Sequence, residues 1–200
     1  MNRIFIDRWR SRMLSYEAAA QIIVALEKAE LPYMLVGSLS SMLYGVSRNT
    51  KDADFVVEFG DQRISAVARL LPSEFKLDPQ VSFESVTGTT RFIFDVATTG
   101  FRIELFKLSS DPHDQERFRR RAQIPIPHLG CTACVPTPED VVITKLRWSL
   151  HANRNKDRDD VRDVITVRGE LLDWDYIHRW CDQHGTRDAL DEIRKSIPQP

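Results

Sequence analysis

Two carboxylates one residue apart are the strongest chemical signal in the sequence. Asp52 and Asp54 open the segment DADFVVEF, whose apolar and aromatic residues are typical of a β-strand. Side chains at positions i and i+2 of a strand share one face, with Cα atoms roughly 6.5–7 Å apart. Two such carboxylates can converge on one divalent cation, or on two cations about 3.5–4 Å apart. The spacing therefore indicates a metal site for phosphoryl chemistry.

A Gly-Ser step lies upstream of these carboxylates. Gly37 and Ser38 follow the apolar run YMLV, which predicts a short buried strand, and residues 38–44 form a candidate helix that Gly45 would close. Backbone N–H groups at the start of such a helix bind phosphate through their own donors and the partial positive charge of the helix end, and the Ser38 hydroxyl would add a contact. A nucleotide site is therefore expected beside the metal site.

The elements that must position these residues alternate between helix and strand over the first 135 positions. A helix is predicted over residues 16–30, where apolar residues recur at helical spacing and Pro32 follows. Another helix is predicted over residues 114–121, with Ser110 or Asp111 as its expected cap. A further helix is predicted over 60–71, and the remaining predicted strands are 52–59, 82–87, 91–98, 101–108 and 131–135.

The pattern becomes helical throughout after Val135. Pro136 and Pro138 frame a helix start, and helices are expected over 139–150, 157–172, 173–185 and 186–197. We therefore predict an α+β fold with a mixed sheet flanked by helices, followed by a helical portion. The predicted division is an α/β core with an N-terminal helix over residues 1–135 and a helical region over residues 136–200.

The composition limits the protein's partners and location. The 200 residues carry a net charge of −1, so no global field attracts nucleic acid or an anionic membrane. No apolar stretch approaches the ~18–20 residues needed to cross a bilayer, and Arg3, Asp7, Arg8, Arg10 and Arg12 interrupt the apolar positions of the N-terminus. These features predict a cytoplasmic protein with no membrane partner, and they leave its oligomeric state open.

The Gly-Ser step and the two aspartates belong to a longer pattern that is similar to a known family signature. Gly37-Ser38 followed by Arg48-x-Thr50-x-Asp52-x-Asp54 resembles the signature of the nucleotidyltransferase superfamily with the polymerase-β-like core. The R-x-T-x-D-x-D form is similar to that of the minimal nucleotidyltransferases and AbiEii-like toxins. The resemblance implies a nucleotidyltransferase-like mixed sheet, in which Gly37, Ser38, Arg48 and Thr50 bind the nucleotide and Asp52 and Asp54 hold Mg²⁺ against its phosphates.

The resemblance also implies a third carboxylate on a later strand. Ile103-Glu104-Leu105-Phe106 matches the expected context, with Glu where the family more often has Asp. Glu104 would join Asp52 and Asp54 as a catalytic and metal-binding residue in a two-metal Mg²⁺ site that could also take Mn²⁺, and it would orient or deprotonate the acceptor hydroxyl. The plainer interpretation makes Glu104 a cross-strand partner of Arg91 or Arg102.

The helical half resembles the same family more weakly. Lys145 matches a lysine that would offset charge on the triphosphate, although it also fits a lysine that lies along a helix face with its ammonium in solvent. An acid from the next helix is implied, for which Asp157 and Asp160 both fit and Asp160 is favoured. Arg154 is a further candidate for a phosphate contact.

Three functions remain open. The first is transfer of a nucleoside monophosphate from a nucleoside triphosphate to a hydroxyl of RNA (tRNA) or protein, with a possible role as the toxin of a toxin–antitoxin pair that has an antitoxin partner. The second is transfer to a small molecule, as in antibiotic nucleotidyltransferases, which requires an acceptor pocket lined with acids. The third is a nucleotide-binding module without turnover.

Two further patterns favour ordinary structural roles. Four arginines between positions 117 and 121 indicate a solvated helix face or, alternatively, a local basic patch for a tRNA-like acceptor. Cys131 and Cys134 are spaced as in a zinc site, but no second pair follows, so two partly buried strand cysteines are expected.

Overall fold

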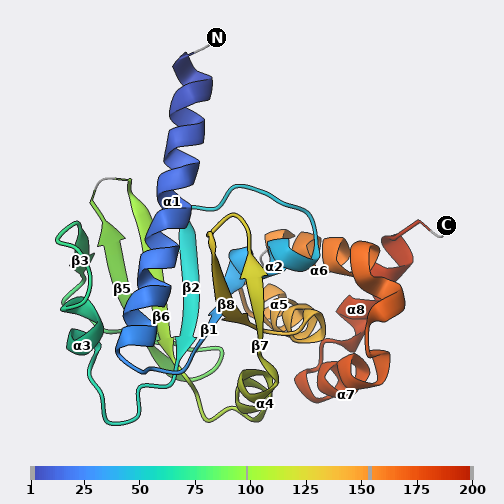
Figure 1. Ribbon diagram of the computed structural model, residues 1–200. Helices are drawn as coiled ribbons and strands as arrows, with labels where there is room; N and C mark the ends of the chain where they lie inside the picture. Colours follow the sequence, from blue (N-terminus) through green and yellow to red (C-terminus); the bar gives the residue numbers. More distant parts are fainter. Residues whose placement is uncertain (1–2, 98, 153–154, 199–200) are drawn as a thin grey trace.

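The computed structural model describes residues 3–97, 99–152 and 155–198. Strand β2 (Asp52–Val57), which carries both aspartates, lies inside its main sheet (Figure 1). The strand order is β1–β2–β6–β5–β3, with β4 paired to β5. Strands β2 and β6 are parallel, whereas the other neighbours in this sheet are antiparallel. The predicted mixed sheet flanked by helices is confirmed. The other strands are β1 (Tyr33–Val36), β3 (Phe75–Leu77), β4 (Ser82–Glu84), β5 (Thr89–Val96) and β6 (Phe101–Lys107), and a separate pair is formed by β7 (Ala122–Ile126) and β8 (Cys131–Val135).

Helices cover the sheet and make up the C-terminal part of the chain (Figure 1). They are α1 (Arg3–Lys28), α2 (Gly37–Tyr44), α3 (Ile64–Ala68), α4 (Pro112–Arg120), α5 (Pro138–Ala152), α6 (Asn155–Arg168), α7 (Trp174–His184) and α8 (Arg187–Ser196), with a short 3₁₀ helix at Gly169–Leu171. Asp111 caps α4 as expected, because its side chain accepts hydrogen bonds from two backbone N–H groups of the first turn. No helix in the described ranges is long and apolar enough to span a membrane.

Side-chain alternation gives the sheet two different faces. In β2, Phe55 and Val57 belong to a buried core that also contains Ile22 and Leu26 of α1. Because successive residues of a strand point to opposite faces, Asp52 and Asp54 lie on the other face. Asp54 is paired in register with Glu104 of β6, so the two carboxylates from separate strands share that face.

A second core lies among the C-terminal helices. It contains Leu146 of α5, Val164 of α6, Ile177 of α7 and Leu190 of α8. Tyr44, at the end of α2, packs against both cores and donates a hydrogen bond of 2.8 Å to the backbone of Pro136. The sheet and the helical part therefore meet at α2, and the division at residue 135 stays a prediction.

Several predicted elements have different bounds. Helix α1 begins at Arg3 rather than at residue 16, and the helix expected over 60–71 is reduced to Ile64–Ala68. The helix expected over 157–172 runs from Asn155 to Arg168 and continues as the 3₁₀ turn. Strand β7 was not predicted, because Pro125 argues against a strand; the two-stranded sheet accommodates it since both of its strands are edges.

Candidate active site

The face of the sheet that carries the aspartates forms one wall of a pocket of about 260 Å³. Asp52, Asp54 and Glu104 line this wall. The opposite wall comes from α5, whose residues Val141, Thr144, Lys145 and Trp148 recur at helical spacing and so lie on one face of that helix. The structure therefore brings the predicted carboxylates and Lys145 into one cavity.

The Gly-Ser step closes one side of this pocket. Gly37 has a φ of +66°, a backbone conformation that favours glycine, and a Cβ atom built at this position would overlap the Asp54 carboxylate. Gly37 is also the first residue of α2, so the positive end of that helix lies against Asp54. Ser38 is buried beside it and also lines the pocket.

The carboxylates repel one another. Burial, followed by the charges of Asp52 and Glu104, raises the pKa of Asp54 from 3.8 to about 7, and the positive charges of Lys145 and Lys156 only partly oppose this. A divalent cation would relieve the repulsion, and carboxylate oxygens are the ligands that Mg²⁺ prefers. The donor set at Asp52 and Asp54 therefore fits a hard divalent ion.

Both carboxylates beside Asp54 already have partners. Thr50 donates a hydrogen bond to Asp52 Oδ1, and Arg91 Nη1 lies 2.8 Å from Glu104 Oε2. Arg102, the other suggested partner of Glu104, pairs with Asp95 instead. Within the described residues, no group of three or more His, Cys, Asp or Glu side chains is arranged to hold a metal ion. Glu104 thus differs from the two aspartates in that it forms an ion pair with an arginine.

Arg48 joins the Gly-Ser step to the helical half. Its guanidinium makes two contacts of 3.1 Å with the Asp160 carboxylate, and Nη2 also donates a 2.8 Å hydrogen bond to Ser38 Oγ. Burial raises the pKa of Asp160, but the hydrogen bond from Arg48 and the charge of Lys145 outweigh it and hold that pKa below its usual value. Arg48 therefore fixes the start of α2 relative to α6.

Lys145 binds both candidate acids of α6. Its Nζ lies 2.8 Å from Asp157 Oδ1 and 2.8 Å from Asp160 Oδ2, and the residue is 8% exposed. The two aspartates are therefore joint partners of the lysine rather than alternatives. Lys145 therefore does not have its ammonium in solvent, which was the alternative suggested by its position on a helix face. Arg154, the further candidate, lies outside the described residues.

Lys156 also belongs to the pocket, although it is not among the predicted site residues. Lys156 lies in the first turn of α6, lines the pocket, and is near enough to Asp54 for its charge to lower the pKa of that carboxyl. No local pattern marks it, because Lys156-Asp157 is also a common way to begin a helix. Its position becomes visible only when α6 is placed against the sheet.

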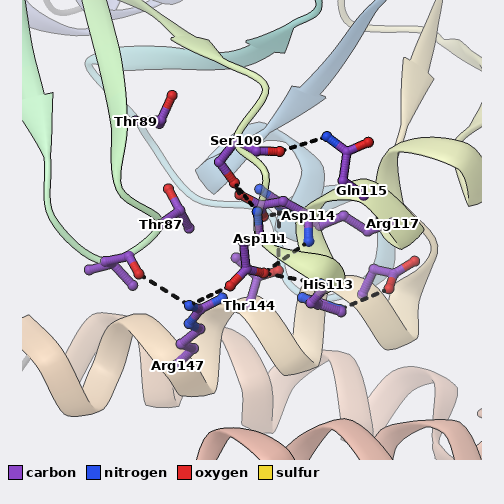
Figure 2. Close-up of polar contacts among 12 residues, drawn as sticks. Thr87, Thr89, Ser109, Asp111, His113, Asp114, Gln115, Arg117, Thr144 and Arg147 are labelled. Atoms are coloured by element: carbon purple, nitrogen blue, oxygen red, sulfur yellow. Dashed lines mark hydrogen bonds and ion pairs between the residues drawn. The ribbon is translucent and has the colours of Figure 1, made fainter.

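The arginines between positions 117 and 121, at the end of α4 and directly after it, have partners within the protein and do not form a uniform basic face. Arg117 is buried and bonds Asp114 at 2.8 Å, whereas Arg120 lies over the ring of Tyr176 and pairs with Asp140 at 3.3 Å. Figure 2 shows Asp114 and Arg117 side by side, and both residues line the pocket. Arg121, directly after α4, lies over the ring of Phe118, so three of the four arginines contact an acid or an aromatic ring.

The turn between β4 and β5 is tied to α5. Arg147 donates hydrogen bonds to the backbone oxygen of Val86 at 3.1 Å and to Asp111 at 2.8 Å (Figure 2). Thr87 and Thr89, which line the pocket, belong to this turn and to the strand that follows it. Arg147 therefore holds in place the part of the pocket wall that contains Thr87 and Thr89.

The two strand cysteines are free. Cys131 and Cys134 are half-buried on β8, and neither is in a disulfide. This placement agrees with the ordinary structural role expected for them.

No protein-family model matches the chain, and no curated protein matches it by sequence. Solved structures with the same fold do exist. An antigenic nucleotidyltransferase-like protein from Paracoccidioides brasiliensis is 17% identical, with a TM-score of 0.57 over 96% of this chain and 95% of that one. The antibiotic-resistance factor ANT(2'')-Ia, in its structure with adenylyl-2''-tobramycin, is 14% identical, with a TM-score of 0.58 over 86% of this chain and 97% of that one. At these identities the likeness shows the fold alone, and that fold is nucleotidyltransferase-like.

Proposed function

We propose that the protein is a Mg²⁺-dependent nucleotidyltransferase that moves a nucleoside monophosphate from a nucleoside triphosphate to a hydroxyl group. One observation carries the proposal: the start of α2 and the Asp54 carboxylate are in contact at Gly37, inside one pocket with Asp52 and Glu104. A helix N-terminus attracts phosphate, and paired carboxylates attract a divalent cation. A metal-bound triphosphate needs both attractions in one place. The nucleotidyltransferase-like fold of the chain supports the same conclusion.

The roles follow from these positions. Backbone N–H groups of Gly37 and Ser38 would bind the phosphates, with Arg48 fixing the Ser38 hydroxyl. Asp52 and Asp54 would hold Mg²⁺, with Mn²⁺ as a substitute. When bound, the metal neutralises charge on the phosphate oxygens, which is the main electrostatic demand of phosphoryl transfer. Thr50 keeps the Asp52 carboxylate oriented through its hydrogen bond.

Glu104 would act on the acceptor. The acceptor oxygen attacks the α-phosphorus, the bond to the bridging oxygen breaks, pyrophosphate leaves, and the hydroxyl proton passes to the Glu104 carboxylate. Arg91 contacts Oε2 of Glu104, and an ionised carboxylate has about four acceptor positions, so capacity remains for the hydroxyl or for a metal. In this proposal Arg91 fixes the direction of the carboxylate.

We favour RNA, with tRNA as the first candidate, or protein as the acceptor. A polycationic drug would require surplus acids in the pocket. The lining acids outside the catalytic set are Asp114, Asp140 and Asp157, and each already bonds a cation, namely Arg117, Arg120 and Lys145. The small-molecule alternative remains the second candidate, because ANT(2'')-Ia shares the fold. If the acceptor is RNA or protein, the protein could act as a toxin with an antitoxin partner. We also propose a cytoplasmic location.

A transfer assay tests the proposal. The protein is incubated with each α-³²P-labelled nucleoside triphosphate, Mg²⁺ and one of three acceptors: total tRNA, cell protein or an aminoglycoside mixture. We expect label in the tRNA or protein fraction, and none with the double variant Asp52→Ala, Asp54→Ala. Label in the aminoglycoside alone would establish the second candidate. Nucleotide binding without label in any fraction would identify a binding module and overturn the proposal.

A further inference from the structure

We propose that Lys156, rather than Lys145, is the lysine that contacts the triphosphate, and that Lys145 is a positioning residue held between two aspartates. This inference rests on the proposed function, because it assumes that a triphosphate binds in the pocket. It reverses the role that the sequence suggests for Lys145, and it assigns a role to a residue that no sequence pattern singles out.

The charge of Lys145 is already compensated. Its ammonium lies 2.8 Å from Asp157 and 2.8 Å from Asp160, and Asp160 also accepts two hydrogen bonds from Arg48. Among the described residues, Lys145, Arg48 and the two carboxylates thus form one cluster of ion pairs. Moving Lys145 to a phosphate would leave buried carboxylates without one of their cations, which is costly in a protein interior. Lys145 is therefore suited to fix α5 to α6.

Lys156 has the opposite surroundings. It is partly exposed and lines the pocket, and within the described parts of the chain no ion pair joins it to a carboxylate. Its charge nevertheless reaches Asp54, the carboxylate in contact with Gly37. An uncompensated ammonium on a four-carbon stem can follow a ligand oxygen, and such a lysine acts on phosphate as a point charge.

The two lysines lie on neighbouring helices, Lys145 on α5 and Lys156 on α6. The ion pairs of Lys145 with the aspartates of α6 hold these two helices together. Lys145 anchors Asp157, the residue immediately after Lys156 in the first turn of α6. Holding that turn in place therefore determines where the Lys156 stem starts. The buried ion pair of one lysine would thus position the ammonium of the other beside the phosphate site.

Calorimetric binding separates the two roles without relying on turnover. The probe is the α,β-methylene nucleoside triphosphate that the wild type binds most tightly, with Mg²⁺, and the matching monophosphate serves as reference. Lys156→Ala should weaken triphosphate binding about 10- to 100-fold, the range expected for a lost charged hydrogen bond, and should weaken monophosphate binding less. Lys156→Arg should keep most of the affinity. Lys76→Ala on β3, outside the pocket, makes the same change in net charge and should bind like the wild type.

Lys145→Met supplies the other half of the test. It should lower the unfolding temperature in the absence of nucleotide, whereas Lys156→Ala should not. The inference is overturned if Lys156→Ala binds the triphosphate as tightly as the wild type. It is also overturned if Lys145→Met loses affinity at an unchanged unfolding temperature. If the wild type itself binds no nucleoside triphosphate, the proposed function fails as well, and the two failures are thereby distinguished.

Discussion

The backbone of Gly37 lies so close to the Asp54 carboxylate that a single methyl group at position 37 would overlap it. The contact joins the start of α2, directly after β1, to the middle of β2, and β1 and β2 are antiparallel neighbours with Val36 opposite Asp54. The glycine is therefore required twice, for its positive φ and for this approach. The proposed metal and phosphate site depends on that contact.

Gly37→Ala tests the contact directly. The substitution should lower the free energy of unfolding and abolish transfer, because both the strained φ and the overlap displace Asp54 or α2. Gly130→Ala in the turn between β7 and β8 is the matched control, since Gly130 has a φ of +65° but nothing within 4 Å of the added Cβ, and it does not line the pocket. The control should cost only the conformational strain, about 1–2 kcal/mol, and leave transfer intact. Equal losses in the two variants, measured by denaturant unfolding, would contradict the importance of the contact.

Asp54→Asn should stabilise the metal-free protein. The pKa of Asp54 is raised to about 7 when folded, so the folded state holds a proton more tightly than the unfolded state, and stability falls as pH rises from about 4 to 7. A neutral Asn avoids that loss. In EDTA at pH 8 we expect a gain on the order of 1–3 kcal/mol, with a smaller gain at pH 5. Thermal unfolding at both pH values measures it, with Asp61→Asn on the exposed turn as control.

Mg²⁺ should stabilise the wild type more strongly at pH 8 than at pH 6. Binding requires the ionised form of Asp54, so the ion must displace a proton at the lower pH. A ligand present at 100 times its dissociation constant adds about 2.7 kcal/mol to the free energy of unfolding. The rise in unfolding temperature on adding Mg²⁺ should disappear in Asp52→Ala, Asp54→Ala. A rise that persists in the double variant would show that the ion binds elsewhere.

Arg48 and Asp160 should be energetically coupled. A double-mutant cycle with Arg48→Ala and Asp160→Ala should give a coupling energy of about 0.5–3 kcal/mol, because each variant removes the same bidentate pair. Arg48→Ala should also weaken nucleotide binding by releasing Ser38. Arg162, which pairs with Asp159 on the exposed side of α6, offers the matched control, and Arg162→Ala should have almost no effect. Additive losses at Arg48 and Asp160 would refute the coupling.

Local chemistry explains what the sequence alone could predict. The period of two in a strand placed Asp52 and Asp54 on one face, and the glycine before a helix placed Gly37 at a turn. These inferences need only neighbouring residues. Because Glu104 is registered opposite Asp54 in a parallel pair, the prediction that it shares their face also agrees with the structure.

Contacts between distant segments explain what could not be predicted. Arg48 and Asp160 are 112 positions apart, and although the family resemblance assigns both to one site, nothing in either segment indicates that they form an ion pair with each other. The partners of Arg117 and Arg120, and the pairing of β7 with β8 despite Pro125, likewise depend on packing. The difference between Lys145 and Lys156 has the same origin, since it depends on which carboxylates surround each lysine.

The most direct test of the central claim is a crystal structure with an α,β-methylene nucleoside triphosphate and Mn²⁺, whose anomalous scattering identifies the metal. We predict a manganese peak bound by Asp52 and Asp54, with the phosphates on the backbone N–H groups at the start of α2. A metal bound away from both aspartates, or a triphosphate that does not touch the Gly37-Ser38 step, would contradict the account.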